Sequence, residues 1–170
     1  MTAEIGQPSN DASSHSDPTD RPPGGQGSQP APTAGQMNPA ANPVKVLVVE
    51  DSPVIRERLV ALIADLPNID IVGQAADGFN AQTLFRQHRP DAVVLDIQLP
   101  GINGLDLLAE FKVKDPACIV IVLTTYAFKE VRNRCAALGA DHFFDKAMEF
   151  ERVTEVLRTL PTRRGLKTGS

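Results

Sequence analysis

Five polar residues at the ends of short apolar runs have side chains that suit phosphoryl chemistry. Glu50 and Asp51 lie at the end of one run, and Asp96, Thr124 and Lys146 lie at the ends of three others. Carboxylates that share one cleft repel one another, and a hard divalent cation relieves that repulsion. Mg²⁺ takes oxygen ligands and needs only one or two protein carboxylates besides a phosphoryl oxygen. If the fold gathers these residues, the sequence predicts a magnesium-dependent phosphoryl site.

Asp96 is the candidate nucleophile of this set. A carboxylate can attack phosphorus and form an acyl phosphate, while a metal ion and the ammonium of Lys146 neutralise the incoming group. The hydroxyl of Thr124 can donate a hydrogen bond to a phosphoryl oxygen. Each residue alone has an ordinary explanation as a helix cap, a turn residue or a solvated charge. The functional interpretation is favoured because all of them end apolar runs.

Short apolar runs and helical patterns alternate along the chain and predict the elements that position these residues. The apolar runs predict five strands: Val44–Val49, Ile69–Gln74, Ala92–Leu95, Cys118–Leu123 and Asp141–Phe144. Apolar residues at helical spacing and capping residues predict five helices between and after them: one that starts at Ser52-Pro53 and stops near Asp65, then Gly78–His88, Gly104–Lys112, Phe128–Leu138 and Phe150–Leu160.

Five strand–helix units predict an α/β fold, a doubly wound five-stranded parallel sheet with helices on both faces. Three of the runs are almost wholly apolar, as in strands that are covered on both sides. In such sheets the working site lies beyond the carboxyl ends of the strands. The candidate residues all fall there.

The two ends of the chain differ in composition from the core. Residues 1–43 are rich in proline and glycine and contain no aromatic residue, so we expect a disordered arm there. Residues 161–170 contain Arg163, Arg164 and Lys167 and are expected to form a flexible basic tail. The tail is too short for an output domain, so we expect the protein to signal in trans.

Charge and hydropathy argue against several function classes. The net charge is −4 and no basic field covers the core, so direct DNA binding is not expected. The N-terminus lacks the pattern of a signal peptide, and the longest apolar run is far too short to span a bilayer. We therefore expect a cytoplasmic protein without a membrane segment.

Residues 44–160 resemble a receiver domain of the bacterial two-component response regulators, of the single-domain, chemotaxis type. The resemblance rests on the segments 47–52, 93–101 and 103–105, and on three single residues, Thr124, Phe143 and Lys146. It implies a flavodoxin-like fold with strand order 2-1-3-4-5. It also implies a switch rather than an enzyme, which at most catalyses its own phosphorylation and dephosphorylation.

The resemblance assigns a role to each residue near the site. Asp96 corresponds to the phospho-acceptor. Mg²⁺ would be held by Glu50, Asp51 and Asp96 and by the backbone carbonyl of Gln98, and Lys146 would pair with the phosphoryl group. The phosphoryl donor would be a sensor histidine kinase or a phosphotransfer protein.

The output is expected to start from Thr124 and Phe143, the counterparts of the family's switch residues. Thr124 would move towards the phosphoryl group, and Phe143 would then turn from an outward to an inward rotamer. This would change the surface formed by 128–138, the last strand and 150–160. A downstream protein, which the sequence does not name, or a second copy of the chain would bind there.

Two departures and three alternatives remain at this point. Ala147 follows Lys146 where the family usually has a proline in a cis bond, so we expect a trans bond. The switch aromatic is phenylalanine rather than tyrosine.

A phosphatase with an aspartate nucleophile is disfavoured because Gln98 replaces the second aspartate. A flavodoxin-type nucleotide site is disfavoured because Glu50 and Asp51 would repel phosphate. A receiver-like docking module that is never phosphorylated is the third alternative.

Overall fold

A central parallel sheet organises the fold of residues 42–161, the part of the chain that the computed structural model describes. Its strands lie in the order β2-β1-β3-β4-β5 and every neighbouring pair is parallel, which confirms the predicted order and fold class. The strands are β1 (Val44–Val49), β2 (Ile69–Ala75), β3 (Ala92–Leu95), β4 (Ile119–Thr124) and β5 (His142–Asp145).

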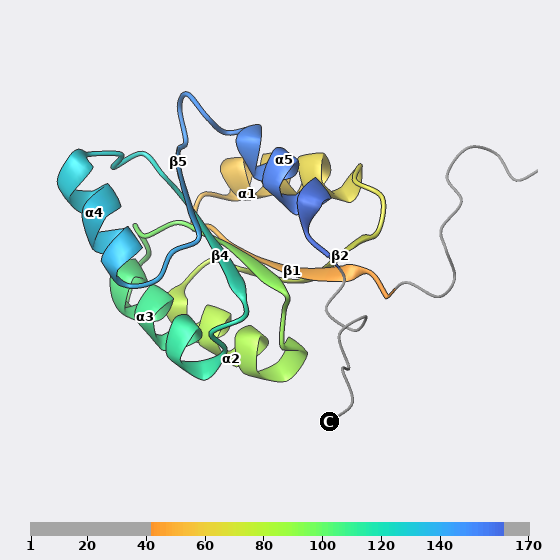
Figure 1. Cartoon of the computed structure of the whole chain (residues 1–170), viewed down its shortest axis with the longest axis horizontal. Coiled ribbons are helices and arrows are strands. Elements are labelled where there is room, and N and C mark those ends of the chain that lie inside the picture. The colour runs from red at the N-terminus through yellow and green to blue at the C-terminus, as the bar shows by residue number, and fades with distance from the viewer. Residues whose placement is uncertain (1–41, 162–170) are drawn as a thin grey trace, which may run out of the picture. The chain divides into compact units, whose positions relative to one another are not determined.

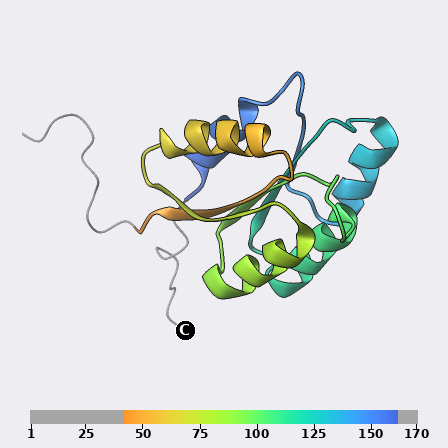
Figure 2. The ribbon, with the colours of Figure 1, turned by 180° about the vertical axis from the view of Figure 1, so that it is seen from behind.

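Five helices form two layers around this sheet (Figure 1). They are α1 (Pro53–Ala64), α2 (Gly78–His88), α3 (Gly104–Lys114), α4 (Lys129–Ala137) and α5 (Arg152–Thr159). Helices α1 and α5 cover one face, while α2, α3 and α4 cover the other, as the view from behind also shows (Figure 2).

The alternation of side chains along the strands divides the core into two halves. In β1, Leu47 and Val49 belong to the cluster under α2 and α3, whereas Val46 and Val48 belong to the cluster under α1 and α5. Strands β1 and β3 therefore need apolar residues at almost every position, as the sequence predicts for strands covered on both sides.

Local sequence signals explain where α1 begins and ends. The Ser52 hydroxyl accepts a hydrogen bond from the Ile55 N–H at 3.5 Å, and Pro53 occupies the first turn, where its missing N–H costs nothing. The helix ends at Ala64, and Asn68 adopts a positive φ of 60° before β2. Asparagine tolerates this left-handed conformation better than most residues do. These signals place the start of α1 directly after the turn that carries Glu50 and Asp51.

Most predicted boundaries hold to within two residues, but the prediction for the start of α4 is wrong in one respect. Phe128 was expected to open the apolar stripe of this helix, yet its side chain is 62% exposed. It is the N-cap residue, and its backbone is extended, so it lies outside the helical periodicity that the prediction assumed. Its ring instead contacts Tyr126 edge-on, with ring centroids 6.0 Å apart.

The expected arm over residues 1–43 and the expected tail over 161–170 lie outside the described residues, apart from 42–43 and 161. Within residues 42–161, no helix is long and apolar enough to cross a membrane.

Candidate functional site

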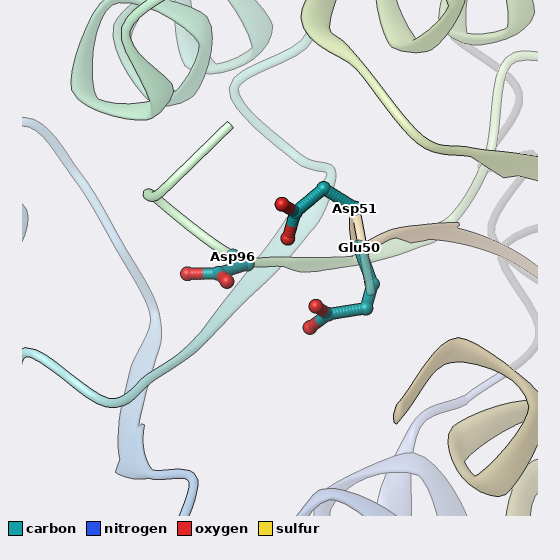
Figure 3. Close-up of side chains that lie close together, drawn as sticks. All are labelled: Glu50, Asp51 and Asp96. Atoms are coloured by element: carbon teal, nitrogen blue, oxygen red, sulfur yellow. The ribbon is translucent and has the colours of Figure 1, made fainter. Parts of the chain in front are cut away.

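Three carboxyl groups meet at the carboxyl edge of the sheet (Figure 3). Glu50 and Asp51 follow β1, and Asp96 follows the neighbouring β3. One ligand atom from each lies within 4.8 Å of the other two. Glu50 and Asp96 are 1% and 3% exposed, whereas Asp51 is exposed. Of the three residues, only Asp51 is exposed to solvent.

Lys146 joins this cluster from the end of β5. Its Nζ lies 2.7 Å from Glu50 Oε2 and 2.7 Å from Asp96 Oδ2, and its side chain is buried. The backbone N–H of Lys146 donates to the Thr124 carbonyl at 2.9 Å, which ties the residue to β4. The described residues contain no cis peptide bond, so the Lys146–Ala147 bond is trans, as predicted.

Burial and pairing shift the pKa values inside the cluster. Burial raises the pKa of Glu50, and the opposing effects of Lys146 and the Ser52 N–H are smaller. Burial alone would lower the pKa of Lys146, but the hydrogen bonds and charges of Asp96 and Glu50 outweigh it and raise this pKa. Lys146 therefore stays positively charged, and a single ammonium faces three carboxyl groups. This imbalance favours a bound cation.

Hydrogen bonds fix the two buried carboxyl groups but not the third. Glu50 accepts from the Ser52 N–H at 3.1 Å with one oxygen and from Lys146 with the other. Asp96 likewise accepts from the Gln98 N–H at 3.0 Å and from Lys146. Within residues 42–161, the Asp51 carboxylate has no hydrogen bond or ion pair. Its oxygens are available to an incoming ion.

The ligand atoms that this cluster offers fit magnesium. They are all oxygens, and hard carboxylate oxygen is the ligand that Mg²⁺ prefers over the nitrogen and sulfur ligands of softer metals. Glu50, Asp51 and Asp96 each bring one carboxylate oxygen into the group, so each of the three could serve as a ligand. The role of the Gln98 carbonyl stays a prediction, because the observed contacts of Gln98 at the site are made through its N–H and its side-chain oxygen.

Thr124 ends β4 and is fully buried. Its Oγ1 accepts a hydrogen bond from the Tyr126 N–H at 3.2 Å, which leaves the hydroxyl proton to be donated elsewhere. The next residue, Thr125, donates from its hydroxyl to the Gln98 side-chain oxygen at 2.8 Å. The loops that follow β3 and β4 are thus linked to each other beside Asp96.

The outward position expected for Phe143 is not found. Phe143 is only 9% exposed and belongs to the core cluster beneath α3 and α4. Arg132 from α4 covers its outer side, with the guanidinium carbon 4.5 Å from the ring centroid. Arg132 also donates to the Phe143 carbonyl at 3.0 Å and lies 3.8 Å from Glu149. This cover stabilises the buried position of the ring.

Two residues with contacts at or beside the site were not predicted from the sequence. Arg56 donates from its guanidinium to the Glu50 carbonyl at 2.7 Å. Glu149 accepts from the Asp145 N–H at 3.0 Å, just before Lys146. Arg56 could have been found from its place one turn into a helix that begins at the site. Glu149 has no comparable sequence signal.

Curated relatives match the region that contains this cluster. The probable transcriptional regulatory protein TcrX of Mycobacterium tuberculosis is 40% identical over 129 residues, which cover 74% of this chain and 53% of that protein. A protein-glutamate methylesterase/protein-glutamine glutaminase of Methanospirillum hungatei is 36% identical over 115 residues, 66% of this chain and 34% of that protein. The chain spans about a third to a half of the length of these relatives.

Solved structures share the fold. The response regulator domain of Thermotoga maritima CheB is 28% identical, with a TM-score of 0.61 over 68% of this chain and 94% of that chain. A chain of the CheX-CheY-BeF3-Mg²⁺ complex from Borrelia burgdorferi is 28% identical, with a TM-score of 0.59 over 67% and 89%. The family model of the response regulator receiver domain matches residues 46–158, and the chain belongs to that family of two-component signalling domains.

Proposed function

We propose that this chain is a phosphorylation-activated switch in which Asp96 accepts a phosphoryl group. The observation that carries the proposal is the meeting of three carboxyl groups within 4.8 Å, with the Lys146 ammonium 2.7 Å from Asp96. A buried nucleophile beside a fixed cation is arranged to receive a dianionic group rather than to cap a helix.

The donor proposed is a phosphohistidine of a sensor histidine kinase or of a phosphotransfer protein. A carboxylate oxygen of Asp96 attacks phosphorus, the new P–O bond forms and the P–N bond breaks. The imidazole leaves with its electron pair and takes up a proton. The product is an acyl phosphate on Asp96, and Lys146 pairs with one of its phosphoryl oxygens.

Magnesium would be held by Asp51 and Asp96, by Glu50 directly or through water, and by the Gln98 carbonyl. When bound, it neutralises charge on the transferring phosphoryl group. The residues of the chain do the rest: Glu50 keeps Lys146 in place, and the Gln98 N–H orients the Asp96 carboxylate.

The signal would leave the site through Thr124 and the surface of α4, β5 and α5. The hydroxyl proton of Thr124 can be donated to a phosphoryl oxygen, since its Oγ1 already accepts from the Tyr126 N–H. Movement of Thr124 would then disturb the contact between Arg132 and Phe143, because β4 and β5 are neighbours. A downstream partner or a second copy of the chain would sense the changed face in trans.

Phosphorylation of the full chain tests the proposal. The protein is incubated with a small phosphodonor and Mg²⁺, and the intact mass is measured for wild type and for Asp96→Asn. We expect one phosphoryl adduct in the wild type, none in the variant and none after chelation of the metal. Asp106→Asn, an exposed carboxylate on α3, is the matched control and should be phosphorylated normally.

An adduct that persists in Asp96→Asn would place the acceptor elsewhere. No adduct in the wild type with any phosphodonor would favour the alternative of a docking module that is never phosphorylated.

A further inference from the structure

Arg56 contacts the turn between β1 and α1 in a way that has no role in the scheme above. It lies in the first turn of α1 and is partly buried. Its Nη1 donates to the Glu50 carbonyl at 2.7 Å and reaches the Asp51 carbonyl at 3.5 Å. One guanidinium nitrogen thus contacts the backbone of two adjacent residues that both carry site carboxylates.

The position of Asp51 needs an explanation, because electrostatics opposes it. Its carboxylate lies within 4.8 Å of the ligand atoms of Glu50 and Asp96, and like charges at this range repel. Lys146 pairs with those two residues and is not paired with Asp51. The side chain of Asp51 also has no hydrogen bond within residues 42–161. Its place must therefore be set by the backbone that carries it.

We infer that Arg56 is a positioning residue that holds this backbone, and so keeps Asp51 directed at the metal position before the ion arrives. A site whose ligands are already in place loses less conformational entropy on binding than one that must first be ordered. Arg56 itself cannot be a ligand, since a guanidinium has no acceptor atom. This inference rests on the proposed magnesium site and adds the residue that preorganises it.

The charge of Arg56 makes the inference easy to test. A positive charge beside a cation site weakens cation binding, so a bystander arginine would inhibit the site and its removal would tighten Mg²⁺ binding. A positioning arginine has the opposite effect, because its removal frees the turn and weakens binding. The two roles therefore differ in the sign of the change.

Titration calorimetry of the full chain with Mg²⁺ measures that sign. We expect Arg56→Gln to bind Mg²⁺ about 10-fold more weakly than wild type, the lower end of the effect of residues that support metal ligands. Arg56→Lys keeps the charge but not the planar fork of the guanidinium, so its Mg²⁺ affinity should lie between those of Arg56→Gln and wild type. Arg58→Gln removes the same charge from an exposed side chain of the same helix and should bind as tightly as wild type or slightly more tightly.

Amide hydrogen exchange of the metal-free proteins gives a second readout. We expect faster exchange at Asp51 and Ser52 in Arg56→Gln, with the protection of β1 and β3 unchanged. Equal or tighter Mg²⁺ binding by Arg56→Gln would overturn the inference. Should that variant fail to fold, Arg56→Lys decides: weaker binding supports the inference, and binding equal to wild type overturns it.

The outcome for Arg56 is separable from that of the site itself. If wild type binds no Mg²⁺ and accepts no phosphoryl group, the proposed function fails. If wild type does both and the Arg56 variants bind Mg²⁺ as wild type does, only the role of Arg56 fails.

Discussion

Helices α3 and α4 cover the same face of the sheet but are anchored to it very differently. Four residues of α3 are buried, including Leu107, Leu108 and Phe111, whereas α4 buries only Cys135. Helix α3 follows the loop of the proposed phospho-acceptor, and α4 follows the loop of Thr124. Elements with few buried apolar contacts open most easily. The proposed phosphoryl chemistry thus lies beside the firmly packed helix, and the proposed output beside the loosely packed one.

The charged groups of the two regions differ in the same way. Around Asp96 the ion pairs are buried and short, whereas Arg132 of α4 and its partner Glu149 have side chains that are 47% and 23% exposed and lie 3.8 Å apart. Exposed pairs contribute little to stability, while breaking a buried pair is costly. Substitutions in the two regions should therefore differ in how strongly they affect stability and in which property of the protein they change.

Lys146→Met should have the largest effect, because it leaves Glu50 and Asp96 buried without their cation. We expect the free energy of unfolding to fall by about 3–5 kcal/mol without metal, with part of the loss recovered when Mg²⁺ is added. Urea unfolding with and without Mg²⁺ measures both. Lys129→Met on α4 is the control and should change stability little. A loss below about 1 kcal/mol for Lys146→Met would mean that the buried charges are not paired as described.

Thr124→Val should separate the reaction from the response. Valine has nearly the shape of threonine and keeps the position filled, but it cannot donate to a phosphoryl oxygen. We expect phosphorylation of Asp96 to continue while the change in amide exchange of α4 on phosphorylation is lost. Intact mass and hydrogen exchange are measured on the same samples. An α4 response equal to that of wild type would show that the signal leaves by another route.

Arg132→Ala should loosen α4 without affecting the phosphoryl site. It removes the guanidinium that stacks on Phe143 and the hydrogen bond to its carbonyl, together worth about 1–2 kcal/mol. We expect faster amide exchange in α4 and an unchanged Mg²⁺ affinity. Arg134→Ala, an exposed cation of the same helix, is the matched control. Equal exchange in the two variants would argue against any cover of Phe143 by Arg132.

The smallest effect is expected from pH. The Asp145 N–H, then Arg152, lower the pKa of Glu149, with a smaller contribution from Arg132. A carboxyl group with a lowered folded pKa stabilises the fold above its unfolded pKa, and this contribution is lost as the pH falls through the folded value. Between about pH 5 and pH 3, Glu149→Gln should therefore lose less stability than wild type. Thermal unfolding across that range measures the difference, and parallel curves would contradict it.

The sequence alone determined the elements of this protein and the edge of the sheet at which its polar residues meet. Apolar runs such as Val44–Val49 and the Ser52-Pro53 helix start are local signals, and parallel strands bring their carboxyl ends to one edge whatever their neighbours are. The strand order agreed with the family resemblance. These features depend on periodicity and capping, which can be read within a few residues.

Only the tertiary structure decided which side chains touch at that edge. Lys146 pairs with Glu50 across 96 residues of sequence and with Asp96 across 50. Arg132 covers Phe143 from another element, so the ring is buried where an outward rotamer was expected. These contacts depend on the direction and length of side chains that meet from different strands and helices, and no periodic pattern in the sequence records them.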